Sequence, residues 1–164
     1  MKRSKQRGVA AVELALIIGP MLIAVFGITE LGRALYQYNA LVKATRGAAR
    51  YLAQQDLANL STSDLTAVYN KTIELTVCGD TPCTGKEPLA SGLSTAQVRL
   101  CDYLTCPITH MGVLTEKDGG SVDLVSVTIG GAGAQPYWFR SMVPAWVADL
   151  SFSPIKTTMT ARYN

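Results

Sequence analysis

Four cysteines are the residues of this chain best suited to form covalent or metal bonds. They occur as two pairs with the same spacing, Cys78 and Cys83 in "CGDTPC" and Cys101 and Cys106 in "CDYLTC". Each spacing closes a short loop, so local pairing into two disulfides is preferred among the three possible connectivities, although sequence alone leaves all three open. A zinc site using all four cysteines is the rival interpretation. Zinc ligands are usually separated by about two to four residues, and these pairs are at the upper limit of that range.

The remaining reactive residues do not form a catalytic set. The single histidine, His110 in "CPITHMG", has no acid or nucleophile placed beside it by a motif, so we expect a solvent-facing or packed loop histidine. The glycine-rich "GGAGA" at 130–134 lacks the ending of a phosphate-binding loop and is expected to be a flexible turn. The sequence therefore predicts a protein that is not an enzyme and that holds no cofactor or metal.

One acid, Glu13, interrupts the most apolar segment. From Val9 to Thr29 the chain has 21 residues with a single charge. As a helix they would be about 31 Å long, enough to cross a membrane. A charged side chain in hydrocarbon costs about 2.5–3.5 kcal/mol, so Glu13 needs a compensating role. It could lie near the membrane edge, pair with a basic group, or mark a site of cleavage and assembly.

The net charge of +3 comes from the first few residues. Without residues 1–8, 11 basic residues face 12 acidic ones, so the chain has no phosphate-binding surface and nucleic acid is not an expected partner. Basic residues beside a spanning helix favour a cytoplasmic N-terminus, which would place the cysteines in an oxidising compartment. Four such basic residues lie within the first seven positions: Lys2, Arg3, Lys5 and Arg7.

The helical pattern continues beyond the apolar segment. Apolar or small residues recur at alternating four- and three-residue steps, at Leu31, Leu35, Tyr38, Val42, Thr45, Ala49 and Leu52. We expect one helix from about Val9 to about Leu57, membrane-spanning over 9–29 and amphipathic over 30–58.

After the helix the hydrophobic period changes. Residues 65–78 are predicted to begin as a helical turn and end as a strand, whereas 96–101 and 121–130 alternate as half-buried strands. A last strand is expected from about Leu150 to Tyr163, with Pro154 near its start.

These elements predict an α+β fold in which a long N-terminal helix precedes a small antiparallel sheet in a domain over 59–164. The aromatic segment 137–146, "YWFRSMVPAW", is expected to cover the sheet as part of the core, in preference to an exposed docking surface.

The first eight residues are a short basic leader that ends in Gly8. A hydrophobic helix follows, and its fifth residue after Gly8 is Glu13. This arrangement resembles the N-terminus of a type IV prepilin. More specifically, residues 7–53 resemble the TadE-like family of tight-adherence (Tad) pilus assembly proteins. The motifs that carry the resemblance are "AAVELAL", the proline after it, "FGITELGRAL" and "AARYLA", and the ending "TTMTARYN" is similar to the family's final strand.

The resemblance implies a minor pilin or pseudopilin. A prepilin peptidase would remove residues 1–8 by cutting between Gly8 and Val9, and the new ammonium on Val9 would pair with Glu13 of an adjacent subunit. Expected partners are this peptidase, other minor or major pilins and the inner-membrane assembly platform, in a hetero-oligomer. The chain would cross the bacterial inner membrane once, with its N-terminus in the cytoplasm and its C-terminal domain in the periplasm. It would then be taken into, or lie below, a surface filament that serves adhesion.

Just beyond the apolar segment, Glu30 and Arg33 have the spacing of a helical ion pair. We favour a local pair over contacts to neighbouring subunits.

Two other classes of protein remain in competition. A signal-anchored or secreted periplasmic binding module would use residues 1–29 only for targeting, but the apolar core is long for a signal peptide and the helix continues through it. A periplasmic enzyme would need a catalytic constellation that the sequence does not supply.

Overall fold

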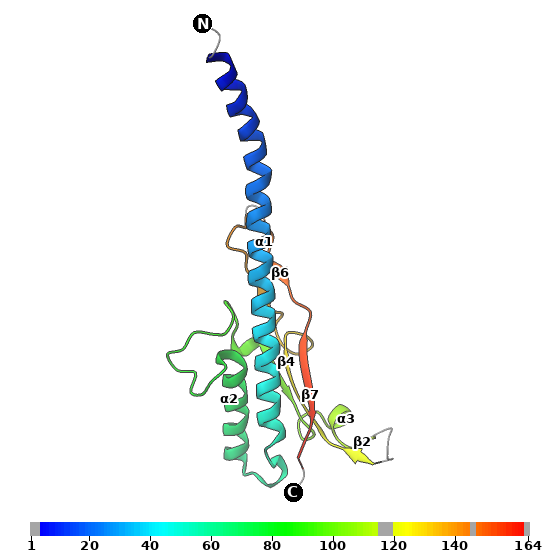
Figure 1. Ribbon diagram of the computed structural model, residues 1–164. Coiled ribbons are helices and arrows are strands. Elements are labelled where there is room, and N and C mark those ends of the chain that lie inside the picture. The colour runs from blue at the N-terminus through cyan, green and yellow to red at the C-terminus, as the bar shows by residue number, and fades with distance from the viewer. Residues whose placement is uncertain (1–3, 115–119, 145–146, 163–164) are drawn as a thin grey trace.

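The computed structural model of the chain describes residues 4–114, 120–144 and 147–162. Helix α1 (Ser4–Ala53) includes Pro20 and is continuous through it. Its N-terminal half projects alone, while its C-terminal half packs against the rest of the chain (Figure 1). The helix ends a few residues before the predicted limit at Leu57, and a short 3-10 helix, η1 (Leu57–Asn59), follows.

Helix α2 (Thr62–Cys78) covers all of 65–78, so the predicted helical start is right and the predicted change to a strand is wrong. The helix starts at the N-cap Ser61, whose hydroxyl accepts from the Asp64 amide, and stops at Gly79, which has a φ of 74°. Three of its β-branched residues recur one turn apart and are buried: Val68, Thr72 and Thr76. Contact between α2 and α1 therefore outweighs local strand propensity.

Three strands form an antiparallel sheet among the described residues, in the order β1-β4-β7. They are β1 (Val98–Cys101), β4 (Leu124–Ile129) and β7 (Ile155–Thr160). The predicted segment 96–101 begins inside a 3-10 turn, η2 (Thr95–Gln97), before its strand starts. A long helix followed by a small antiparallel sheet confirms the predicted α+β fold class.

The core lies between α1, α2 and the sheet. The C-terminal half of α1 runs along β4 and β7, as its contacts and Figure 1 show. Alternate residues of β4 point into this core, as the period of two predicts. The central buried residues are Leu41, Ala48, Ala49 and Leu52 of α1 and Val125, Val127 and Ile129 of β4.

The predicted strand over 121–130 is interrupted at Asp123. The Asp123 carboxylate accepts from the Gly112 amide at 2.7 Å, while its carbonyl accepts from the Ala161 amide at 2.8 Å. Short strand β3 (Ser121–Val122) therefore leaves the main sheet and pairs with β2 (Val113–Leu114).

The predicted last strand is also two strands. Strand β6 (Leu150–Ser151) pairs with β5 (Trp138–Phe139), whereas β7 begins after Pro154 and pairs with β4. Proline has no amide hydrogen for a ladder, which accounts for the break. Strand β7 ends at Thr160, and the predicted end at Tyr163 lies outside the described residues.

The "GGAGA" segment forms the turn that follows β4. All three of its glycines have positive φ angles. At Gly133 a Cβ atom would lie only 1.5 Å from the Arg99 guanidinium, which donates to the Ala132 carbonyl at 3.0 Å. A side chain here would displace the flexible end of Arg99, and the positive φ of 83° is the stronger reason for glycine.

The aromatic segment 137–146 is only partly core. Tyr137 and Phe139 are buried, with Phe152 packed beside both rings. Trp138 and Met142, by contrast, are 50% and 75% exposed. Residues 145–146 lie outside the described part of the chain. The prediction that this segment covers the sheet as part of the core is therefore right for Tyr137 and Phe139 and wrong for Trp138 and Met142.

Candidate assembly site on the N-terminal helix

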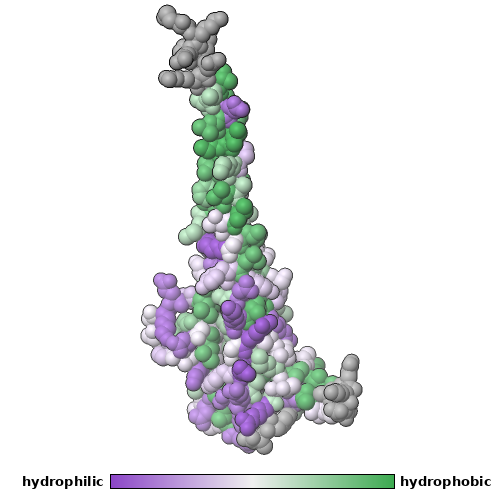
Figure 2. Space-filling view, viewed as in Figure 1, coloured by the Kyte–Doolittle hydropathy of each residue, from purple (hydrophilic) through white to green (hydrophobic). Residues whose placement is uncertain are grey.

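The projecting half of α1 exposes apolar side chains around its circumference. Figure 2 shows it as a nearly continuous hydrophobic column, and Val9, Leu16 and Ile28 are each about 70% exposed. In the described part of the chain, α1 is the one helix long and apolar enough to cross a membrane, and none of its most apolar window is buried. A helix in the core of a soluble domain would bury one face, so this surface fits a membrane or other helices.

Glu13 shares one face of this helix with the predicted cleavage site. Gly8, Val9, Val12, Glu13 and Leu16 together line a shallow surface hollow. Helical side chains tilt towards the N-terminus, so the carboxylate of Glu13 is directed towards the turn that holds Val9. This placement leaves room for contact with an ammonium at Val9 of the same chain or of a neighbour.

Several glycines of α1 lie on its free surface. A Cβ atom added at Gly19, Gly27 or Gly32 would meet no heavy atom within 4 Å. The fold of a single chain therefore does not need glycine at these positions. Small residues in membrane helices allow close approach of a second helix, which is a reason for glycine that involves a partner.

The Glu30–Arg33 pair lies where the free helix meets the domain. The Arg33 Nη2 atom lies 2.9 Å from Glu30 Oε2, and the Glu30 side chain is buried. Both residues also bind the aromatic segment: Arg33 donates to the Arg140 carbonyl at 2.6 Å, and Glu30 Oε1 accepts from the Met142 amide at 3.2 Å. The pair is therefore local, as favoured from the sequence, but it also joins α1 to a segment more than a hundred residues away.

An aromatic ring completes this junction, which we call the clasp (Glu30, Arg33, Phe139, Arg140 and Met142). The guanidinium carbon of Arg33 lies 4.6 Å from the centre of the buried Phe139 ring. Sequence reasoning missed the last three residues because the contacts are remote in the chain. The available signal was the mixture of arginine and aromatic residues in 137–146.

The cysteines form two local disulfides, Cys78–Cys83 and Cys101–Cys106. The first joins the last residue of α2 to the loop that follows, and the second joins the end of β1 to the N-cap of α3 (Pro107–His110). Within the described residues the four sulfurs do not form one metal-binding cluster. The zinc interpretation with all four cysteines is therefore wrong for this structure.

His110 is a packed histidine. It is buried, and its ring nitrogens lie 2.6 Å from the Thr109 hydroxyl and 2.8 Å from the Ser126 hydroxyl. Burial lowers the pKa of its imidazole below the ordinary 6.5, the charge of Lys156 acts in the same direction, and Asp102 opposes both. Ser126 is itself buried, so this hydrogen-bonded pair is closed to a substrate.

A groove of about 620 Å³ lies between α1 and α2. Its lining includes Ala40, Ala44 and Gly47 of α1 and Leu75 of α2, and Lys43 is the one charged residue among the described residues that line it. A single ammonium among small and apolar groups is not a catalytic arrangement.

Comparison with known proteins gives a family match for the N-terminal region. Residues 8–50 match the family model described as TadE-like protein, which confirms the predicted resemblance and associates the chain with Tad pili. The matched stretch covers Gly8, Glu13 and the clasp residues of α1, and it ends before the sheet domain. No curated protein and no solved structure matches the chain.

Proposed function

We propose that this chain is a minor pilin or pseudopilin that takes part in assembling a Tad-type surface pilus for adhesion and surface colonisation. The observation that carries the proposal is the free apolar surface of α1, which continues without a linker into the packed helix of the domain. The family match covers the same stretch. In this proposal α1 crosses the inner membrane once, with a cytoplasmic N-terminus and a periplasmic domain.

A prepilin peptidase removes residues 1–8 in this proposal. Support comes from the basic leader and from Gly8, which is exposed on α1 at the start of the apolar surface. Cleavage after Gly8 frees the amino group of Val9, and the new ammonium lies at the edge of the apolar segment.

Glu13 then takes part in assembly. The carboxylate and a new ammonium would neutralise each other, and attraction between opposite charges is strong where water is excluded. Pairing between chains would hold neighbouring helices in register, with their small residues allowing close contact. The partners are other pilins and the inner-membrane assembly platform, so the chain works in a hetero-oligomer without enzymatic activity, cofactor or bound metal of its own.

Replacing Glu13 with alanine tests the pairing. Glu13→Ala should leave insertion and leader removal largely intact, but recovery of partner pilins with the affinity-tagged chain from detergent-solubilised membranes should fall several-fold. Glu87→Ala, which removes an exposed carboxylate in the domain, is the control and should recover partners normally. Unchanged recovery with Glu13→Ala would refute pairing between chains and leave only a contact within one chain.

Replacing Gly8 with valine tests the processing step. Gly8→Val should leave a larger chain that keeps its leader, because the cut requires a small residue in this proposal. Gel mobility in cells with and without the peptidase is the measurement. A normal mobility shift for the variant would argue against cleavage at this position.

A further inference from the structure

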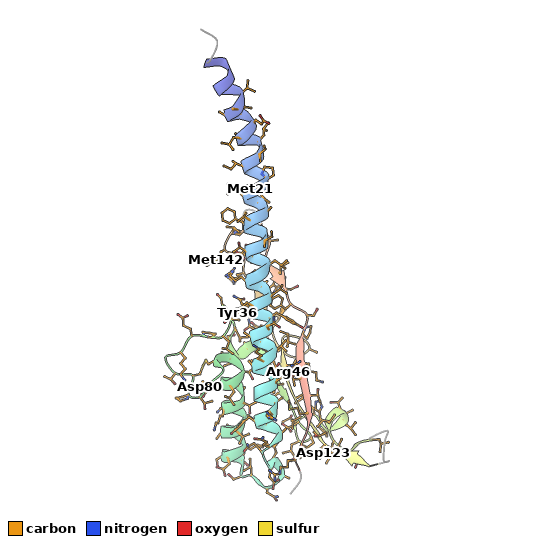
Figure 3. All side chains as sticks on the ribbon, viewed as in Figure 1. Met21, Tyr36, Arg46, Asp80, Asp123 and Met142 are labelled. Atoms are coloured by element: carbon orange, nitrogen blue, oxygen red, sulfur yellow. A yellow bond between two sulfur atoms is a disulfide. The ribbon has the colours of Figure 1, made fainter. Side chains whose placement is uncertain are left out.

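Apolar side chains surround the clasp on the outside of the molecule. We call this set the collar; its members are between 44% and 75% exposed and come from α1, β5, β6 and the segment between these strands: Leu31, Trp138, Met142 and Leu150. Met142 belongs to the clasp through its backbone amide and to the collar through its side chain. Figure 3 shows that Met142 lies beside α1 between the levels of Met21 and Tyr36. The collar is therefore the part of the domain nearest to the apolar column.

The depth of the collar follows from the helix. Residues 9–29 span about 31 Å, close to the roughly 30 Å hydrocarbon thickness of a bilayer. The headgroup region adds about 5–8 Å on each side, or roughly four to five further helical residues. Glu30 and Arg33 lie within that interval, and both bind the segment that includes Met142.

The clasp holds the collar at this level. Two hydrogen bonds and the Arg33–Phe139 contact fix the segment to α1, and the Ser141 amide donates to the Asp149 carboxylate at 2.9 Å. Strand β6 pairs with β5, so Leu150 lies opposite Phe139. The exposed apolar groups are therefore held in place together.

We propose that the collar rests on the lipid bilayer, in the boundary between headgroups and acyl chains of the periplasmic leaflet. The composition fits this boundary, where tryptophan and tyrosine are enriched and arginine reaches lipid phosphates. Arg140 takes part in the clasp only through its backbone carbonyl, and its exposed side chain supplies such a cation. The inference rests on the proposed function only in requiring that α1 spans the membrane.

Fluorescence of Trp138 in the full chain tests the contact. The chain has two tryptophans, so Trp146→Phe leaves Trp138 as the only indole. The variant is reconstituted in phosphatidylcholine vesicles whose acyl chains carry bromine near the headgroup end, and emission is compared with unbrominated vesicles. We expect Trp138 to lose about half its emission. Circular dichroism of the variant should match that of the unaltered chain, which establishes that the variant is folded.

A tryptophan far from the collar provides the matched control. Leu114, 78% exposed on β2 at the opposite end of the domain, is replaced by tryptophan in a chain that carries Trp138→Phe and Trp146→Phe. This indole should show no quenching by brominated lipid.

Flotation with the vesicles tests the membrane-spanning role of α1 separately from the contact between the collar and lipid. A chain that floats but shows no more quenching at Trp138 than at position 114 overturns the collar proposal alone and favours a protein partner for this surface. A chain that does not float overturns the collar and also the membrane-spanning role of α1 in the proposed function.

Discussion

Glu30 is buried at the point where α1 leaves the domain, and it accepts hydrogen bonds from two directions. One is the Arg33 guanidinium and the other is the Met142 amide. Exposed helical pairs are worth only a few tenths of a kcal/mol, but a buried carboxylate that serves two donors contributes more.

Removing this carboxylate should loosen the clasp. We expect Glu30→Ala to lower the free energy of unfolding by about 2 kcal/mol, because the Met142 amide and the Arg33 guanidinium lose an acceptor. Hydrogen exchange at the Met142 amide should accelerate, and thermal unfolding in detergent measures the overall loss. Glu87→Ala, at an exposed position, should change stability by less than about 0.5 kcal/mol. Equal effects of the two substitutions would show that the clasp adds no stability.

His110 should make the domain sensitive to mild acid. Its pKa is lowered in the folded chain, so between pH 6.5 and the lower folded value the unfolded chain binds more protons. The contribution of His110 to stability is therefore fully present above pH 6.5 and is lost as the pH falls, with a slope of at most about 1.4 kcal/mol per pH unit. The free energy of unfolding of the unaltered chain and of His110→Gln is measured with denaturant between about pH 8 and pH 5 and plotted against pH. The two plots should differ in slope only below pH 6.5. Parallel curves would contradict the prediction.

At the scale of elements, the contact between α1 and α2 depends on small side chains. Ala48 is fully buried at this contact, whereas the adjacent Gly47 is exposed and would accept a Cβ atom without contact. Ala48→Leu should destabilise the domain by about 1–3 kcal/mol through overpacking. Gly47→Ala should instead stabilise it by about 0.5–1 kcal/mol, because alanine restricts the unfolded chain and favours helix. Thermal unfolding of both variants distinguishes the two effects, and a tolerated leucine would show that the helices separate easily.

The Cys101–Cys106 disulfide closes a short loop between β1 and α3. Replacing both cysteines with serine should lower stability by about 2 kcal/mol, the entropy that so short a crosslink removes from the unfolded chain. Cys78 and Cys83 enclose a loop of the same length, so their double replacement is the matched comparison. Denaturant midpoints under non-reducing conditions measure both, and no change from either replacement would show that the loops are held by other contacts.

Sequence patterns predicted elements well where local period and burial agree. Two examples are the alternation of residues along β4 and the repeat of four- and three-residue steps along α1. Each element buries the face that its pattern indicates. The helix α2 was missed because Thr72, Ile73 and Val77 favour strands locally, and only packing against α1 makes the helix preferable. The clasp was missed for a related reason: Glu30 and Arg33 were visible as a pair, but nothing local in the sequence indicates Phe139 or Met142 as their partners.

At the scale of the whole molecule, one helix serves two environments. Its C-terminal half completes the core of the sheet domain, and its N-terminal half leaves that domain as a free apolar column (Figures 1 and 2). The clasp lies at the boundary between the two halves. This division explains why a chain with a small sheet domain exposes so much hydrophobic surface: the column does not pack against any other part of the chain that the structure describes.

The central claim is that the working chain begins at Val9, with its new amino group available to Glu13. Intact mass spectrometry of the chain extracted from membranes of cells that contain the peptidase tests this claim most directly, and the same spectrum reports the oxidation of the four cysteines. We predict a mass corresponding to residues 9–164 with both disulfides formed. A chain that still begins at Met1 would contradict the claim and indicate a plain membrane anchor, and one that begins near Ile28 or Thr29 would indicate a secreted module.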